Sequence, residues 1–369
     1  MEDAPVNDIQ EPEEKFSLKA FTQGMLCVAL IYAIIGGWIW GQSEKTTLAQ
    51  TQRLASKTVI IQWPEKSPMP DSSGGAENSN ADAAAPKSTV IADLPVDTAM
   101  LESGLADAPI QGLFEDTSLG KLPVIRSDGL TSFKAYRRPF DRQLAGNKPL
   151  IAIVIAGLGL SDQATETALR KMPPEVTFAI SPYTASPDFW VREARLRGHE
   201  IWMTLPLESA GFPQVDPGPH TMMIGVPERD NTAKLSWLLT RASGYVGFIT
   251  DQNSTFMNSI LDMRPVVGSI LSHGLALADN AENSNAIAAT MAHGMDAPYT
   301  AIDIWIDETA TQENIRASLE QLEKRARAQG VATGVIRALP VSYQEISRWL
   351  GTLEEKGFVL APLSAQAGQ

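Results

Sequence analysis

Acidic side chains follow several of the strands that the sequence predicts. They are Glu208, Asp251, Asp279, Asp303 and Asp307, the last two on either side of the apolar run Ile304-Trp305-Ile306. In parallel barrels the catalytic groups stand at the carboxyl ends of the strands, so these carboxylates could meet at one mouth. There they could hold a divalent metal or transfer protons. The alternative, which we favour for any single acid, is that each caps a helix or completes a turn.

Other motifs for chemistry are incomplete. Gly157-Leu158-Gly159 follows a predicted strand, but Asp162 stands where a dinucleotide-binding loop needs its third glycine, so a tight turn is the favoured interpretation. The chain contains no G-x-S-x-G elbow and no P-loop sequence. The sequence therefore gives no support to a serine hydrolase or a P-loop nucleotidase.

Histidine, cysteine and net charge narrow the functions further. The 4 histidines are scattered without metal-binding spacing, and Cys27 is the only cysteine, so a zinc site of clustered His or Cys is poorly supported. His199 lies at a predicted helix-to-strand junction, where it is a helix-capping partner or a ligand, with the first preferred. The formal net charge of −13 disfavours nucleic acid as a partner, because phosphate binding needs clustered lysine and arginine.

These residues would be positioned by a series of strand–helix units. The run 148–161 (KPLIAIVIAGLGLS) is apolar until it breaks at glycines, which is typical of a strand buried on both faces of a parallel sheet. Strands are predicted at 151–155, 176–181, 200–205, 245–250, 274–278, 300–303, 330–336 and 358–360. Strands that alternate with helices predict an α/β fold, either an open doubly wound sheet or a (β/α) barrel of about seven or eight strands. We favour the barrel.

Capping residues predict the helix boundaries. Ser161 would cap 163–171, Pro187 would open a helix toward Arg197, Asn231 would cap 232–242, Thr309 would cap 310–329 before Gly330, and Ser342 would begin 343–356.

The residues before the barrel predict a membrane anchor and a tether. Residues 1–20 are polar and acidic, as in a disordered cytoplasmic tail. Residues 21–41 contain the uncharged run Gly24 to Gly41, which is long enough to span a bilayer as one helix. A cleaved signal peptide is the alternative, but the acidic leading segment argues against it. Residues 42–121 are predicted to be a largely disordered linker, and 122–369 form the barrel domain.

From about Leu122 to Ser364 the chain resembles the divergent polysaccharide deacetylase family of bacterial envelope proteins. The resemblance lies in Asp128-Gly129, YRRPF (136–140), IAIVIAGLGLS (151–161), VTFAISPY (176–183), ARLRGHE (194–200), LPLES (205–209), DPGP (216–219), Asp303 to Asp307, and Gly330-Val331-Ala332 leading to Pro340. The family implies a distorted (β/α) barrel, an envelope location, and descent from enzymes that remove acetyl groups from glycans.

The chain departs from the family where the resemblance implies a metal site. The two acids expected in the first turn are Ala156 and Gly157, and the histidine expected before the LPxE stretch is Thr204. A second histidine aligns with Asp251, and a late one with Arg337 or Ala338. Because metal-assisted deacetylation needs about three protein ligands and a base, we predict a degenerate mouth that holds no metal.

These observations predict a pseudoenzyme anchored in the bacterial inner membrane through Gly24–Gly41, with its barrel in the periplasm, that binds a glycan or an envelope protein. The remaining polar lining of its mouth would be His199, Glu208, Asp279, Asp303, Asp307 and Arg337. The charge bias around the anchor does not decide its orientation. Two alternatives stay open. One is an active hydrolase with zinc or another divalent metal held by Asp251, Asp279 and Asp303. The other is a structural subunit of a membrane complex.

Overall fold

The computed structural model describes residues 105–252, 254–280 and 287–367. The predicted tail, the predicted membrane helix at 21–41 and most of the predicted linker lie outside the described residues. Within the described part of the chain, no helix has the length and apolar character that crossing a membrane requires.

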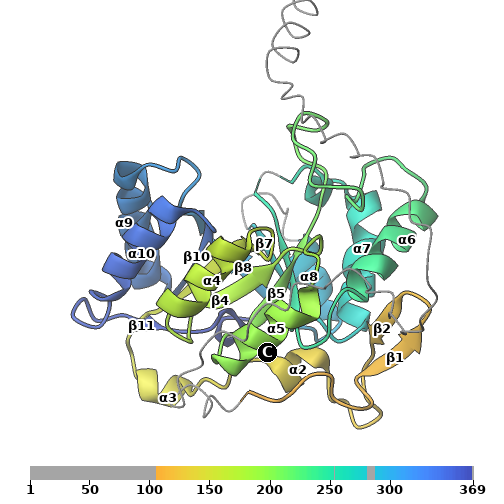
Figure 1. Ribbon diagram of the computed structural model, residues 1–369, viewed down its shortest axis with the longest axis horizontal. Coiled ribbons are helices and arrows are strands. Elements are labelled where there is room, and N and C mark those ends of the chain that lie inside the picture. The colour runs from red at the N-terminus through yellow and green to blue at the C-terminus, as the bar shows by residue number, and fades with distance from the viewer. Residues whose placement is uncertain (1–104, 253, 281–286, 368–369) are drawn as a thin grey trace, which may run out of the picture. The chain divides into compact units, whose positions relative to one another are not determined.

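A parallel sheet forms the centre of the fold (Figure 1). Its strands are β3 (Leu150–Leu158), β4 (Thr177–Ile180), β5 (Ile201–Leu205), β6 (Gly247–Thr250), β7 (Ala276–Asn280), β8 (Tyr299–Ile302), β9 (Ile304–Trp305), β10 (Val331–Arg337) and β11 (Val359–Leu360). The order across the sheet is β8-β7-β6-β5-β4-β3-β10-β9, with β11 beside β3. Each strand predicted from an apolar run is confirmed, and so is the parallel α/β class.

The two ends of this sheet are joined by one short stretch of chain, which makes the barrel nearly closed. β8 pairs with β7, and β9 pairs with β10, yet only Asp303 separates β8 from β9 in the sequence. The Asp303 side chain accepts a hydrogen bond of 2.7 Å from the backbone N–H of Thr333 in β10. It also forms an ion pair of 3.2 Å with Arg325. Asp303 therefore fixes the seam at which the barrel closes.

Alternating side chains divide the barrel interior from the layer under the helices. In β3, the side chains of Ile151, Ile153 and Ile155 pack in the outer apolar cluster, which also contains residues of the helices that surround the sheet. The intervening Ala152, Val154 and Ala156 belong to an inner cluster with Trp202. Since successive strand residues point to opposite faces, small inner residues leave room for the Trp202 ring.

Gly247 in β6 is required by this crowding. A Cβ atom at this position would lie 2.3 Å from the carbonyl oxygen of Ala276 and 2.8 Å from the Trp202 ring. Because the nearest contact is backbone of the neighbouring strand, no side-chain rotation could relieve it.

The amino-terminal end of the barrel is covered by the chain segment after β10. β11 pairs with β3 at Leu150 and Ile151, and η3 (Leu363–Ala365) follows it. The fully buried Glu200 carboxylate holds this segment, accepting hydrogen bonds from the backbone N–H of Ser364 (3.0 Å) and from its hydroxyl. The same carboxylate accepts from Trp202 Nε1 (2.8 Å) and from the backbone N–H of Arg138 (3.0 Å). One carboxylate thus joins three separate parts of the chain.

Helices cover the outside of the sheet. They are α4 (Asp162–Lys171), α5 (Pro187–Leu196), α6 (Glu228–Leu239), α7 (Ile260–Ser272), α8 (Ile287–Gly294), α9 (Gln312–Gln329) and α10 (Pro340–Leu350). Ser161 caps α4 as predicted, accepting from the Ala164 N–H at 3.4 Å, and Gly330 ends α9 in the left-handed conformation.

Three predicted helix starts are wrong. Asn231 does not cap α6 but lies inside it, where its buried amide bonds the backbone N–H and carbonyl of Met223 at 3.0 and 2.9 Å. Thr311, not Thr309, caps α9. Ser342 lies within α10, with its hydroxyl turned to Asp307 at 2.5 Å. In the first and third cases a polar residue that suits a cap binds a residue outside its own helix instead.

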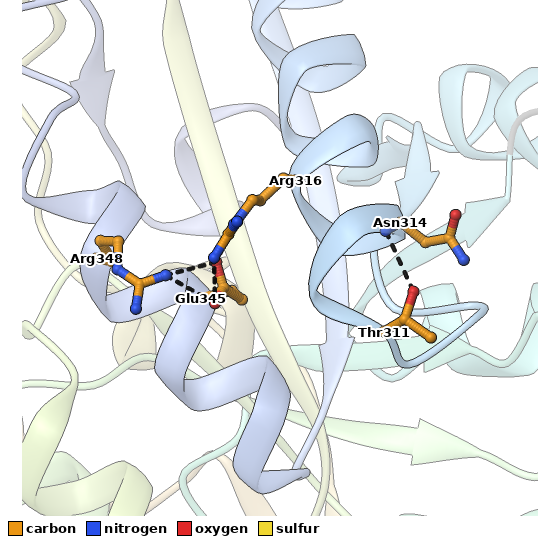
Figure 2. Close-up of polar contacts among 5 residues, drawn as sticks. All are labelled: Thr311, Asn314, Arg316, Glu345 and Arg348. Carbon is orange, nitrogen blue, oxygen red and sulfur yellow. Dashed lines mark hydrogen bonds and ion pairs between the residues drawn. The ribbon is translucent and has the colours of Figure 1, made fainter.

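Helices α9 and α10 lie side by side (Figure 1) and are joined by an ionic cluster (Figure 2). Glu345 of α10 accepts hydrogen bonds from Arg316 of α9 at 2.7 and 3.1 Å, and from Arg348 of its own helix at 2.7 and 2.8 Å. Figure 2 also shows the α9 cap, in which the Thr311 hydroxyl accepts from the Asn314 N–H at 3.3 Å.

The folded part of the chain begins before residue 122. β1 (Phe114–Thr117) and β2 (Gly120–Pro123) form an antiparallel hairpin, and Leu113 beside it is buried. Two short helices, α2 (Ser132–Tyr136) and α3 (Arg142–Ala145), precede the barrel. Leu113 and most of the hairpin fall within the range predicted as linker (42–121), and the lead-in has regular structure that the sequence pattern did not indicate.

Candidate functional site

A cavity of about 410 Å³ opens at the carboxyl ends of the barrel strands. Among its lining residues are Ala156, Gly157, Thr204, Asp251 and Arg337. They come from or directly follow β3, β5, β6 and β10, whose parallel course brings their carboxyl ends to one edge. The structure therefore gathers, in one mouth, the positions at which the sequence departs from the family that it resembles.

The side chains at this mouth do not fit a divalent metal. Thr204 offers a hydroxyl, Asp251 a carboxylate, and Ala156 and Gly157 offer no ligand. Arg337 adds a positive charge, which would repel a cation. Over the described ranges, no group of three or more His, Cys, Asp or Glu side chains is placed to hold a metal ion.

Asp251 stands at the rim of the mouth. Its Oδ1 accepts a hydrogen bond of 2.8 Å from the Gln252 N–H. The carboxylate is reached by solvent, but the surrounding walls displace enough water to raise the pKa of Asp251, while the Gln252 N–H and the Arg337 charge lower it. Asp251 is thus the one acid of the predicted set that lines the cavity.

Arg337 is fixed at the mouth by Asp307, which is fully buried beneath it. Asp307 accepts from the Arg337 backbone N–H at 2.8 Å and lies 3.4 Å from its Nε. Arg337 Nη2 donates to the backbone carbonyls of Asp307 and of Glu308. Asp307 was predicted to line the mouth, but it is occupied with Arg337 and Ser342 below the surface.

Replacing Arg337 with methionine is expected to lower the free energy of unfolding by about 1–2 kcal/mol. The loss is moderate because the Arg337 side chain is 48% exposed and Asp307 keeps the Ser342 hydroxyl and a backbone N–H. Urea denaturation measures the change. Arg229→Met, at a side chain that is 86% exposed, is the control and should stay within about 0.5 kcal/mol of the original protein. Equal effects of the two changes would contradict the assigned role of Arg337.

His199 lies at the opposite end of the barrel from the cavity. It directly precedes Glu200 at the start of β5, is buried, and places its Nδ1 2.9 Å from the carbonyl oxygen of Val176. Its ring stacks on Phe178 with centroids 3.8 Å apart. Burial is the main cause that lowers the pKa of His199 to about 4. The Val176 carbonyl raises this pKa, and the positive charges of Arg138 and Arg197 lower it further. The prediction that His199 lines the mouth is corrected by its place at the amino-terminal end of the strand.

The other predicted acids brace the fold. Glu208 accepts from the Ile224 N–H at 2.9 Å and so holds the long loop after β5. Asp279 lies within β7 and accepts from the Thr250 hydroxyl at 3.0 Å. Asp303 holds the seam of the barrel. None of the three lines the cavity. The sequence placed them near strand ends, but it could not show which way each side chain turns.

Trp305 and Tyr183 line the cavity but were not predicted as site residues. Trp305 directly follows the seam, and its indole Nε1 is buried without a hydrogen-bond partner among the described residues. The Thr204 hydroxyl is likewise buried and has no hydrogen-bond partner among the described residues. The sequence feature that could have indicated Trp305 is its place between Asp303 and Asp307. In that run it was treated as an apolar strand residue like Ile304 and Ile306.

Comparison with known proteins identifies the family. Residues 153–367 match the model of the divergent polysaccharide deacetylase family. An uncharacterized protein from Agrobacterium tumefaciens C58 is 32% identical in sequence, with a TM-score of 0.62 over 67% of this chain and 99% of that chain. No match was found among curated proteins.

Other solved structures are more distant. One is described as a putative cellobiose-phosphate cleavage protein from Enterococcus faecalis V583 (14% identity, TM-score 0.43, 60% of this chain and 100% of that chain). Another is described as a CE4 family pseudoenzyme from Bacillus anthracis (8% identity, TM-score 0.33, 60% and 66%). The family model spans residues 153–367, which include every residue that lines the mouth, and this chain belongs to the divergent polysaccharide deacetylase family.

Proposed function

We propose that this chain is an envelope protein whose barrel mouth binds a partner molecule without metal-dependent hydrolysis. The observation that supports the proposal is the chemistry of the cavity wall. Where the family resemblance implies paired acids and histidines, the wall has Ala156, Gly157, Thr204 and the guanidinium of Arg337. A catalytic metal needs about three protein ligands, and loss of the general base alone would cost about 10²–10⁴ in rate.

The proposed location rests on the sequence before the barrel. The uncharged run at 24–41 would anchor the chain in the inner membrane, and the polar stretch at 66–87 would tether the barrel on the periplasmic side. Such a tether would let the mouth reach partners at a distance from the bilayer.

An active hydrolase with a relocated metal has less support. That metal would need Asp251, Asp279 and Asp303 together, but Asp279 is bonded to Thr250, and Asp303 is bonded in the barrel seam. Neither of these two carboxylates lines the cavity with Asp251.

The purified full chain is expected to release no acetate from N-acetylated chitin or peptidoglycan fragments, with or without added zinc or manganese. Neither ion should raise its melting temperature, because a bound ion would stabilise the folded state by mass action. Asp251→Asn is the matched variant, and it should give the same result with each ion. Metal-dependent acetate release that Asp251→Asn abolishes would overturn the proposal.

A further inference from the structure

We infer that the residues directly before Leu105, 99–104 (AMLESG), dock in a second cavity, which lies beside α5. The inference does not depend on what the mouth of the barrel binds. It is drawn from the place at which the chain enters the described structure, from the length of the segment, and from the side chains that line the cavity.

This second cavity, which we call the α5 cavity, has a volume of about 690 Å³. One wall is formed by Phe189, Val191, Arg192 and Leu196 of α5, and another by 105–109, the first described residues of the chain. Cavities of about 300–1,000 Å³ are large enough to hold a ligand, so the α5 cavity has room for several side chains.

The chain enters the described structure at this cavity. Arg195 of α5 donates to the backbone carbonyl of Ala106 and, at 3.2 Å, to that of Gly244. A Cβ atom added at Gly244 would lie 2.6 Å from the Cβ of Ala108, so these two residues are in close contact. Leu105 itself lines the cavity. The residues before Leu105 must therefore start from the cavity wall.

The segment is long enough to fill the cavity and is held close to it. A helix rises about 1.5 Å per residue, so the α5 wall from Phe189 to Leu196 is about 10 Å long. An extended chain spans about 3.3–3.6 Å per residue, so about three or four residues before Leu105 can reach all of it. A segment on so short a linker has an effective concentration in the millimolar range. A partner from solution would have to outcompete it, which favours the chain's own segment as the occupant.

The apolar side chains of the segment suit the wall. Met100 and Leu101 are the last large apolar residues before Leu105. The wall offers them Phe189 and Leu196, which are both still partly exposed. Methionine adapts well to irregular apolar gaps because its side chain is unbranched. Removal of these side chains from water is the driving force that we assign to docking.

The charge of the segment suits one side of the cavity. The segment contains one acid, Glu102, and no lysine or arginine. Arg192 lines the cavity with a side chain that is 61% exposed, and it lies 3.5 Å from Glu193. A guanidinium has five N–H donors, so Arg192 can bind a second carboxylate beside that of Glu193. Because Asp107 and Asp188 also line the cavity, we place the Glu102 carboxylate on the Arg192 side.

The test is cleavage of the purified full chain by the protease Glu-C, which cuts after glutamate. The rate of cleavage after Glu102 is compared with the rate after Glu77, in the polar stretch 66–87 of the same molecule. Each rate is normalised to that of the same site in a synthetic peptide, and mass spectrometry of the products measures both. A protease can cut the segment only while it is undocked, so the normalised rate after Glu102 is expected to be at least about tenfold lower.

Matched variants of the barrel locate the docking. Phe189→Ser should raise the rate of cleavage after Glu102 about fivefold, since it removes apolar surface from the wall. Leu144→Ser removes an apolar side chain that is 87% exposed and does not line the cavity, and it should have no effect. Arg192→Glu should raise the rate about threefold, because it puts a like charge beside Glu102. Arg229→Glu, at a side chain that is 86% exposed and outside the cavity, is its control.

A change in the segment tests the same contact without altering the barrel. Met100→Gln replaces an apolar side chain with a polar one of similar length. It should raise the rate of cleavage after Glu102 about threefold, because burial of the amide costs free energy. This readout stays valid even if Phe189→Ser lowers the stability of the barrel.

Several outcomes would overturn the inference. Equal normalised rates after Glu102 and Glu77 would show that the segment is not docked. Equal effects of Phe189→Ser and Leu144→Ser, or no effect of Met100→Gln, would show that it is docked elsewhere. Docking within one chain does not depend on protein concentration. Slow cleavage that is lost on dilution of about a hundredfold would therefore assign the cavity to a second copy instead of the chain's own segment.

Discussion

Replacing Glu200 with alanine is expected to lower the free energy of unfolding by about 3–5 kcal/mol, the largest effect expected of any single change considered. The carboxylate accepts hydrogen bonds from the Trp202 indole and from the backbone N–H groups of Arg138 and Ser364. Alanine would leave these donors buried without an acceptor. It would also release the segment that covers the amino-terminal end of the barrel.

Urea denaturation followed by tryptophan fluorescence measures this loss. The matched control is Glu355→Ala, which removes an exposed carboxylate and should change stability by less than about 0.5 kcal/mol. Limited proteolysis adds a local readout, because the segment 359–367 should be cleaved earlier in the Glu200 variant. A Glu200→Ala protein as stable as the control would show that the buried carboxylate does not hold the barrel end.

Acidification from about pH 6.5 to pH 4 is expected to cost about 3 kcal/mol of stability through His199 alone. The pKa of His199 is lowered to about 4 in the folded protein, chiefly by burial, whereas an unfolded chain restores a value near 6.5. Between these values the unfolded state binds the extra proton. Stability therefore falls as the pH falls through this window, and above it the contribution is constant.

The measurement compares the pH dependence of urea midpoints in the original protein and in His199→Gln. The variant should lose stability at neutral pH, because the ring stack on Phe178 is removed, but its stability should fall less steeply between pH 6.5 and 4. His293→Gln, at an exposed position, should retain the original slope. Parallel curves for the original protein and His199→Gln would refute the assignment of the buried neutral ring.

The strands could be predicted from the sequence because the apolar pattern of a buried strand lies within the strand's own residues. Within the run 148–161, β3 is made of apolar residues and one glycine, as expected of a strand that is covered on both faces. Ser161 likewise acts on its own neighbours when it caps α4. Asn231 and Ser342 do not act as caps because their side chains bond Met223 and Asp307, which lie in loops outside the two helices. A pattern within one element cannot show such contacts.

The site was predictable in its location and not in its composition. Thr204, Asp251 and Arg337 meet because parallel strands bring their carboxyl ends to one edge, which the sequence implied. His199 was misplaced because it precedes its strand, and so belongs to the other end of the barrel. Asp307 was misplaced because its depth depends on Arg337 and Ser342, which lie 30 and 35 residues away. Trp305 was missed because a single aromatic residue carries no spacing signal.

The Asp303 seam also limits the strand edges that this barrel presents to other molecules. A sheet with open edges presents unpaired N–H and C=O groups, on which a strand of a second molecule can add. Here the two strands at the ends of the sheet, β8 and β9, follow each other in the chain on either side of Asp303. The edges left at the seam are therefore the four residues of β8 and the two of β9. Edges this short are poor templates for intermolecular strand pairing.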